Sequence, residues 1–98
     1  MLEFLIQADD DGELWPAFHK DRNNDVLTPR GWNAVPIAGW GDHRVRIDDV
    51  EISFSGEFAG WQVSFEGDMD ADRASAIVAT IAEQVRQETG RPVRVVDL

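Results

Sequence analysis

The chain contains no cysteine among its 98 residues. This absence excludes a disulfide framework, a thiolate nucleophile, a zinc site with cysteine ligands and a thiol redox switch. Basic residues are scarce as well, because nine Lys and Arg stand against nineteen Asp and Glu, for a formal net charge of −10. This excess argues against nucleic acid or an anionic membrane as the main partner.

Long apolar runs are also missing. No segment approaches the roughly 20 apolar residues that span a bilayer. The first six residues, MLEFLI, lack the charged n-region and long apolar region of a signal peptide, so we expect a cytoplasmic protein. With 43% hydrophobic residues, the chain has the size and composition of a single domain, residues 1–98, that folds on its own.

Alternation of apolar and polar residues predicts strands in the first half. Leu2–Gln7 alternates and stops at an acidic, turn-forming cluster. Glu13–His19 is expected to return as a second strand, which Pro16 would confine to an edge or a bulge. Residues 20–43 carry turn chemistry throughout, interrupted by a short extended piece around Val35–Ala38.

The pattern is sharper after residue 43. Apolar residues in 44–47 and in 50–54 alternate in opposite phases, so a turn or bulge is required at Asp48-Asp49. Residues 55–60 then connect to the alternating strand 61–66 as a hairpin.

A single long helix is predicted over residues 71–89, because apolar residues recur there at three- and four-residue spacing. Asp70 is a suitable N-cap and Gly90 a suitable stop. The expected fold class is α+β: a two-layer sandwich in which a mostly antiparallel sheet carries this helix across one face. A final strand, 92–97, follows it and runs parallel to 61–66. The core should join Val50, Ile52, Phe54, Trp61, Val63 and Phe65 to Ile77, Val78, Ile81 and Val85.

Acidic residues gather in three groups: Asp9, Asp10, Asp11 and Glu13; Asp48, Asp49 and Glu51; and Glu66, Asp68, Asp70 and Asp72. One interpretation is local, since acids favour turns and helix starts. An EF-hand does not fit, because alignment on Gly12 ends at Phe18 and alignment on Asp68 puts Arg73 at the glycine position. No metal site is predicted.

The other interpretation of these groups is an acidic field that attracts a basic partner, which requires only that the groups lie close in space. If strands 2–7 and 61–66 run in the same direction, the first and third groups emerge at the same end of the sheet.

No catalytic constellation is visible. The serines lack a G-x-S-x-G context, and Gly39-Trp40-Gly41 fails as a phosphate loop because Arg44 stands at the last glycine position. We therefore expect no enzyme and no cofactor. An enzyme that uses His19 or His43 beside a carboxylate is an alternative, which a close pair in a cleft would favour.

Four tryptophans are many for so short a chain. Trp15, Trp32 and Trp40 lie in irregular segments, where large side chains either pin a loop to the core or serve as anchors for a partner. Because interfaces favour Trp and Arg, Arg30 and Arg44 join Trp32 and Trp40 as candidate anchors.

The function expected first is binding of another protein, of basic character, in the manner of inhibitors and immunity proteins that block cationic enzymes. The candidate contact residues are Trp32, Trp40, Arg30, Arg44, Asp9, Asp10, Asp11, Glu66 and Asp68. The alternative is a small-molecule-binding or regulatory domain with a tryptophan-lined pocket between the 20–43 loop and the sheet. The chain is expected to be a monomer or a homodimer, the latter through an exposed edge strand.

Overall fold

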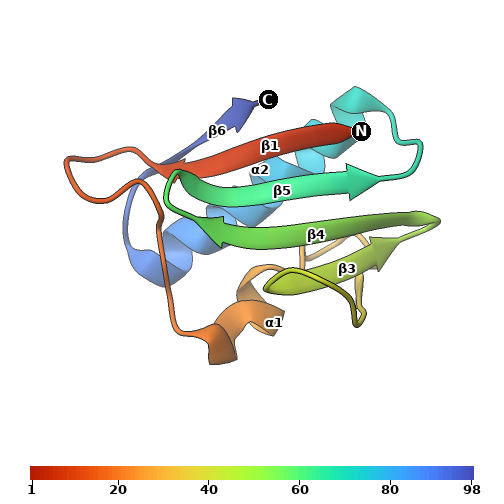
Figure 1. Cartoon of the computed structure of the whole chain (residues 1–98), viewed down its shortest axis with the longest axis horizontal. Coiled ribbons are helices and arrows are strands. Elements are labelled where there is room, and N and C mark those ends of the chain that lie inside the picture. The colour runs from red at the N-terminus through yellow and green to blue at the C-terminus, as the bar shows by residue number, and fades with distance from the viewer.

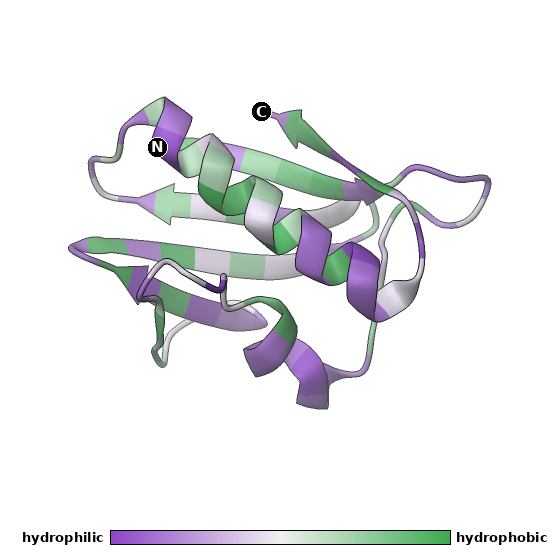
Figure 2. Cartoon of the chain, turned by 180° about the vertical axis from the view of Figure 1, so that it is seen from behind, coloured by the Kyte–Doolittle hydropathy of each residue, from purple (hydrophilic) through white to green (hydrophobic).

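Six strands form one antiparallel sheet, and one long helix crosses one of its faces (Figures 1 and 2). The computed structural model describes all residues, 1–98. In chain order the elements are β1 (Leu2–Ala8), a 3-10 turn (Lys20–Arg22), α1 (Asn23–Val26), β2 (Val35–Pro36), β3 (His43–Ile47), β4 (Val50–Glu57), β5 (Gly60–Glu66), α2 (Ala71–Thr89) and β6 (Val93–Asp97). The strand order is β2-β3-β4-β5-β1-β6. The α+β class predicted from the sequence is confirmed.

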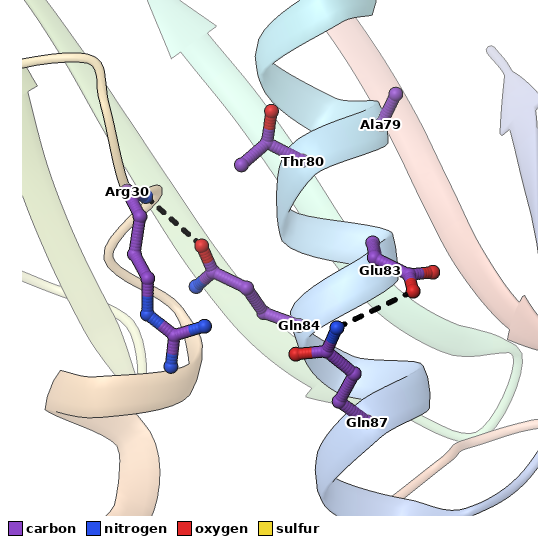
Figure 3. Close-up of a pocket in the computed structure, with 6 residues that line it drawn as sticks. All are labelled: Arg30, Ala79, Thr80, Glu83, Gln84 and Gln87. Carbon is purple, nitrogen blue, oxygen red and sulfur yellow. Dashed lines mark hydrogen bonds between the residues drawn. The ribbon is translucent and has the colours of Figure 1, made fainter.

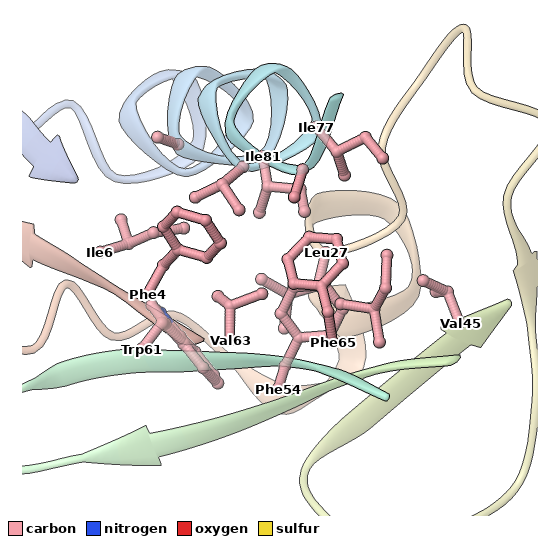
Figure 4. Close-up of a cluster of buried hydrophobic side chains, with 14 of the residues drawn as sticks. Phe4, Ile6, Leu27, Val45, Phe54, Trp61, Val63, Phe65, Ile77 and Ile81 are labelled. Carbon is pink, nitrogen blue, oxygen red and sulfur yellow. The ribbon is translucent and has the colours of Figure 1, made fainter. Parts of the chain in front are cut away.

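Helix α2 begins and ends at the residues that its caps predict. The Asp70 side chain accepts a hydrogen bond from the backbone N–H of Arg73 at 3.1 Å. At the other end, the Gly90 N–H donates to the Arg86 carbonyl at 2.9 Å. One face of the helix packs on the sheet, and every side chain that the periodicity assigned to the helix–sheet core is buried (Figure 4).

The change of phase between β3 and β4 is a two-residue turn. Asp48 has a φ of 53°, a conformation that Asp tolerates better than most residues, and the turn pairs Ile47 with Val50. Because the chain reverses there, the apolar residues of both strands come to the face that α2 covers.

The directions of the strands decide which acidic groups lie at the same end of the sheet. β1 pairs with β5 in antiparallel orientation, so the first and third groups leave the sheet at opposite ends. The second and third groups share one end instead, because β4 begins where β5 ends and Glu51 lies opposite Glu66 (Figure 1). β6 is antiparallel to β1 and therefore runs parallel to β5, as the sequence predicted.

Glu13–His19 is not a strand, and that prediction is wrong. Pro16 has no N–H to donate to a neighbouring strand. The carbonyls of this segment accept hydrogen bonds from groups that do not form a strand ladder with it. The Leu14 carbonyl accepts from the N–H of Ala8 at 2.8 Å, and the Pro16 carbonyl accepts from the indole Nε1 of Trp61 at 3.1 Å.

The 20–43 segment contributes to the core, which its sequence did not indicate. Val26 and Leu27 are buried beside α2. The buried Gln84 side chain of α2 holds the segment through three hydrogen bonds: its Oε1 accepts from the Arg30 N–H at 2.9 Å, and its Nε2 donates to the carbonyls of Val26 and Thr28 at 2.9 and 3.0 Å. The segment is therefore pinned to the helix rather than loose.

The face of the sheet turned away from α2, here called the open face, carries no helix (Figure 1). Its side chains follow from the period of two along each strand. They include Arg44 and Arg46 of β3, Glu51 and Ser53 of β4, Gln62, Ser64 and Glu66 of β5, and Glu3 and Leu5 of β1. The open face is thus mostly polar and charged.

Candidate functional site

An aromatic ring lies over a buried cation on the open face. Trp40 is 59% exposed, and the centre of its ring lies 5.1 Å from Cζ of Arg44. The loop can approach this closely because Gly39 has no side chain, since a Cβ there would lie 2.5 Å from Cδ of Arg44. Trp40 therefore rests on Arg44 by a cation–π contact and leaves most of its surface to solvent.

Two carboxylates hold the Arg44 side chain in place. Its Nε donates to Oε1 of Glu51 at 2.8 Å, and its Nη2 donates to Glu66. Arg44 is only 7% exposed, and its Nη1 is buried without a partner. Glu51 and Glu66 face each other across β4 and β5, where like charges repel, and Arg44 offsets that repulsion.

Arg44 stays charged in this setting. Burial by itself would lower the pKa of the guanidinium, but the hydrogen bonds to Glu51 and Glu66 outweigh burial and raise that pKa above its usual value. Arg44 shares its positive charge between these two partly exposed carboxylates, and the exposed Arg46, which lies opposite Glu51, balances the remaining negative charge.

Apolar side chains border this cluster at the edge of the sheet. Val35 pairs with Arg46, and the N–H of Ile37 donates to the Arg44 carbonyl at 2.9 Å, so both side chains share the open face with Arg44. We call this surface the open-face patch. It consists of Val35, Ile37, Trp40, Arg44, Arg46, Glu51 and Glu66, with Arg46 between Val35 and Glu51. Aromatic residues and arginine are enriched in protein interfaces, and this patch combines Trp40 with Arg44.

Further acids continue the patch at the end of the sheet where β4 begins and β5 ends. The acidic end, as we call it, consists of Asp48, Asp49, Asp68, Asp70 and Asp72. Asp48 pairs with Arg73 at 3.0 Å, and Asp70 caps α2. Asp49, Asp68 and Asp72 have no basic side chain within ion-pair distance. Their charges are thus free to act on a partner.

The structure brings together only part of the sequence-derived candidates. Trp40, Arg44 and Glu66 meet in the open-face patch, with Asp68 at the adjoining acidic end. The sequence analysis did not select Glu51, Val35 or Ile37. The hairpin turn at residues 58–59 fixes the register that puts Glu51 opposite Glu66. This register was the sequence signal that could have identified Glu51 as a site residue.

Arg30 and Trp32 lie elsewhere, against α2. The indole Nε1 of Trp32 donates to Oγ1 of Thr80 at 3.1 Å, and the ring packs against the core. Arg73 lies 5.9 Å from the centre of the same ring. Trp32 thus holds the loop to the helix, whereas the ring of Trp40 is exposed to solvent.

This difference predicts opposite effects of two truncations. Trp32→Ala should lower the free energy of unfolding by about 2–4 kcal/mol, because a large ring leaves the margin of the core and Thr80 loses its donor. Trp40→Ala should change it by less than about 1 kcal/mol, since mainly one exposed cation–π contact is lost. Urea unfolding of both variants measures the difference, and equal losses would contradict the distinction.

The first acidic group is held by arginines at the opposite end of the sheet. Arg94 pairs with Asp9 at 3.0 Å, and Arg91 binds both carboxylate oxygens of Asp10 at 2.8 and 3.0 Å. The hydrogen bond from Arg91 is the main cause that lowers the pKa of Asp10 to about 2. Asp11 has no such partner.

Asp10 should therefore contribute to acid unfolding. Its pKa in the folded protein is below the ordinary 3.8, so its stabilisation is complete above pH 3.8 and is lost as the pH falls to about 2. Asp10→Asn should flatten the fall in stability over this interval, and the control Asp11→Asn should not. Urea midpoints at several pH values measure the slopes, and equal slopes for wild type and Asp10→Asn would contradict the assignment.

The structure contains a shallow hollow of 440 Å³ between the 20–43 loop and α2 (Figure 3). It lies against the helix rather than the sheet, and no tryptophan lines it. Its lining residues are Arg30, Ala79, Thr80, Glu83, Gln84 and Gln87. All the polar side chains except that of Arg30 are hydrogen-bonded within the chain, which leaves few groups to bind a ligand.

The histidines do not form a catalytic pair in a cleft. Nδ1 of His19 lies 3.3 Å from Asp21, but both side chains are exposed. Nε2 of His43 lies 3.0 Å from Oγ1 of Thr28, and burial lowers the pKa of His43. No group of three metal-ligating side chains occurs. None of the helices combines the length and apolar character needed to cross a bilayer.

Comparisons with protein-family models, with curated proteins and with solved structures found no match to this chain. Conclusions about function therefore rest on the chemistry of the surfaces described above.

Proposed function

We propose that this domain binds a cationic protein through the open-face patch and the acidic end. The observation that carries the proposal is the exposed ring of Trp40, displayed on a buried arginine that two carboxylates hold in place. Exposed tryptophans with a fixed orientation are common hot spots of protein interfaces.

The charge of the surface supports a cationic partner. The acidic end has one arginine, Arg73, for five carboxylates, and Arg44 is already shared between Glu51 and Glu66. Such a surface accelerates the approach of a basic protein and repels acidic ones.

The fixed geometry of the patch favours tight binding. Arg44 and its two carboxylates are already in place before a partner arrives, so little side-chain entropy is lost on binding. An acidic domain that covers a basic surface suits an inhibitor or immunity-type protein, whose target is an enzyme made cationic by its own substrate.

Association kinetics test this proposal. The partner is isolated by affinity capture on the wild-type domain at low salt, eluted at high salt and identified by mass spectrometry. Its association rate is then measured with Asp49→Asn/Asp68→Asn and with the control Asp11→Asn/Asp21→Asn, which removes the same charge away from the acidic end. The first pair should slow association by about tenfold at low salt, and this deficit should shrink as salt screens the charges.

The control pair should slow association much less. Equal effects of the two pairs would show that only the overall charge matters. An association rate independent of both pairs and of salt would contradict the acidic end as a contact surface.

A further inference from the structure

The two edges of the sheet differ in their protection against pairing with another strand. At one edge, β2 has only two residues, and one of them is Pro36, which has no N–H to donate. At the other edge lies β6, which has five residues, no proline or lysine, and an uninterrupted register with β1 (Figure 1). Short length, proline, lysine and bulges are the features that protect sheet edges. β6 has none of them.

Alternate residues of β6 turn their backbone groups outward. The Leu98 N–H donates to the Glu3 carbonyl at 3.0 Å, which makes these two residues a hydrogen-bonded pair. Such pairs recur at every second residue of an antiparallel ladder, so the backbone groups of Arg94 and Val96 also bond to β1. The N–H and C=O groups that point away from β1, without a backbone partner in the chain, belong to Val93, Val95 and Asp97.

The side chains around this edge leave it accessible. Val95 is 38% exposed. Arg94 is turned back across β1, where its Nε donates to Oε1 of Gln7 and its Nη1 pairs with Asp9, both at 3.0 Å. The flank of α2 turned away from the 20–43 segment carries three small residues, of which Figure 3 shows one: Ser75, Ala79 and Ala82. Another strand can therefore approach β6.

The positions of the free backbone groups match a second copy of the same strand. The groups are centred on Val95, so an antiparallel copy pairs Val95 with Val95 of the second copy, and Val93 with Asp97. Each outward-facing residue then meets another outward-facing residue, and each pair forms two backbone hydrogen bonds. The two Val95 side chains come to lie against each other on the face that carries α2, because directly opposed residues share a face.

The charges along the edge favour the antiparallel arrangement. The chain has a net charge of −10, but the arginines at the start of β6 are paired, Arg91 with Asp10 and Arg94 with Asp9. Asp97, at the end of β6, has no ion pair. Antiparallel pairing places each Asp97 beside the arginine-bearing start of the other strand. Parallel pairing would place the two aspartates together, where like charges repel.

We propose that β6 is a dimerisation strand, which pairs in antiparallel orientation with β6 of a second copy of this chain, centred on Val95. The two sheets then form one continuous sheet, with both α2 helices on one face and both open faces on the other. The open-face patches lie toward the far edges, so both stay free for a partner. This inference is independent of the proposed function, because it uses only the residues of the β6 edge.

Amide hydrogen exchange of the wild-type domain tests the pairing. The N–H groups of Arg94 and Val96 donate to β1, so they should exchange slowly at every protein concentration. Sedimentation velocity between about 5 and 500 µM should show a mass that rises toward that of a dimer, as expected of a weak interface. Over the same range, exchange at Val93, Val95 and Asp97 should slow by at least about tenfold.

Two opposite substitutions at one position test the register. Val95→Lys and Val95→Glu each place like charges directly opposite each other in the dimer, so each variant alone should dimerise at least about tenfold more weakly than wild type. An equimolar mixture of the two variants should dimerise again, because opposite charges then face each other. Val35→Lys, at an exposed position of the β2 edge, is the matched control and should dimerise like wild type.

Several results would overturn the proposal. One is a monomer at all concentrations with rapid exchange of the three outward amides. Another is a dimer in which those amides still exchange rapidly, or which Val35→Lys weakens as much as Val95→Lys, since the interface would then lie elsewhere. Failure of the mixture to dimerise would contradict the pairing of Val95 with itself. Protection of the outward amides only after a captured protein is added would show that a segment of that protein occupies the edge.

Discussion

Replacing Ile81 with alanine should lower the free energy of unfolding by about 2–5 kcal/mol. Ile81 is fully buried on the face of α2 that packs on the sheet (Figure 4). The substitution removes apolar contacts from a core of 18 buried residues and leaves a cavity that the surrounding strands cannot close. Urea or guanidinium unfolding at neutral pH measures the loss.

Ser75→Ala provides the control on the same helix. Ser75 is exposed, and alanine favours the helix slightly, so stability should stay within about 0.5 kcal/mol of wild type. A loss below about 0.5 kcal/mol for Ile81→Ala would show that the helix packs through a different face.

Arg44→Met should be the most damaging substitution on the open face, with a loss of about 2–4 kcal/mol. Removing one member of a buried ion pair costs about 3–5 kcal/mol, and the partial exposure of Glu51 and Glu66 reduces that cost. Methionine keeps much of the apolar length of the side chain, so the loss reports mainly on charge. The two carboxylates then face each other across β4 and β5 with no cation between them.

A second substitution distinguishes this cause from poor packing. Glu66→Gln added to Arg44→Met removes the repulsion and should recover at least about 1 kcal/mol, whereas Glu66→Gln in the wild-type background should destabilise. The same unfolding experiment, run as a double-mutant cycle, measures the coupling. No recovery in the double variant would contradict the role of Arg44 between the two carboxylates.

The elements predicted correctly were those encoded by local pattern. The spacing of apolar residues and the caps at Asp70 and Gly90 placed α2 at residues 71–89. The change of phase at Asp48-Asp49 required a turn, and a turn is present. Such features depend only on residues that are close in the sequence, so they can be predicted from one sequence alone.

The features that failed depend on distant contacts. Nothing local specifies that β1 inserts between β5 and β6, some sixty and ninety residues away, and this pairing sends the first acidic group to the other end of the sheet. The same limit applies to Glu13–His19. Its carbonyls bind the side chains of Arg91 and Trp61 and the N–H of Ala8, and they form no strand ladder.

The candidate site was predicted in part for the same reason. Trp40, Arg44 and Glu66 were selected one by one for their residue types, but their meeting on the open face follows from the strand pairings. Trp32 was selected on the same grounds as Trp40, and only the contact with Thr80 separates their roles.

The dissociation constant of the captured partner for Trp40→Ala tests the proposed interface most directly. An interface hot spot contributes about 2 kcal/mol or more, so Trp40→Ala should weaken binding by about thirtyfold or more. Its free energy of unfolding should stay within about 1 kcal/mol of wild type. Trp32→Ala, compared at a temperature where it is folded, should bind like wild type. Wild-type affinity in Trp40→Ala would contradict binding through the open-face patch.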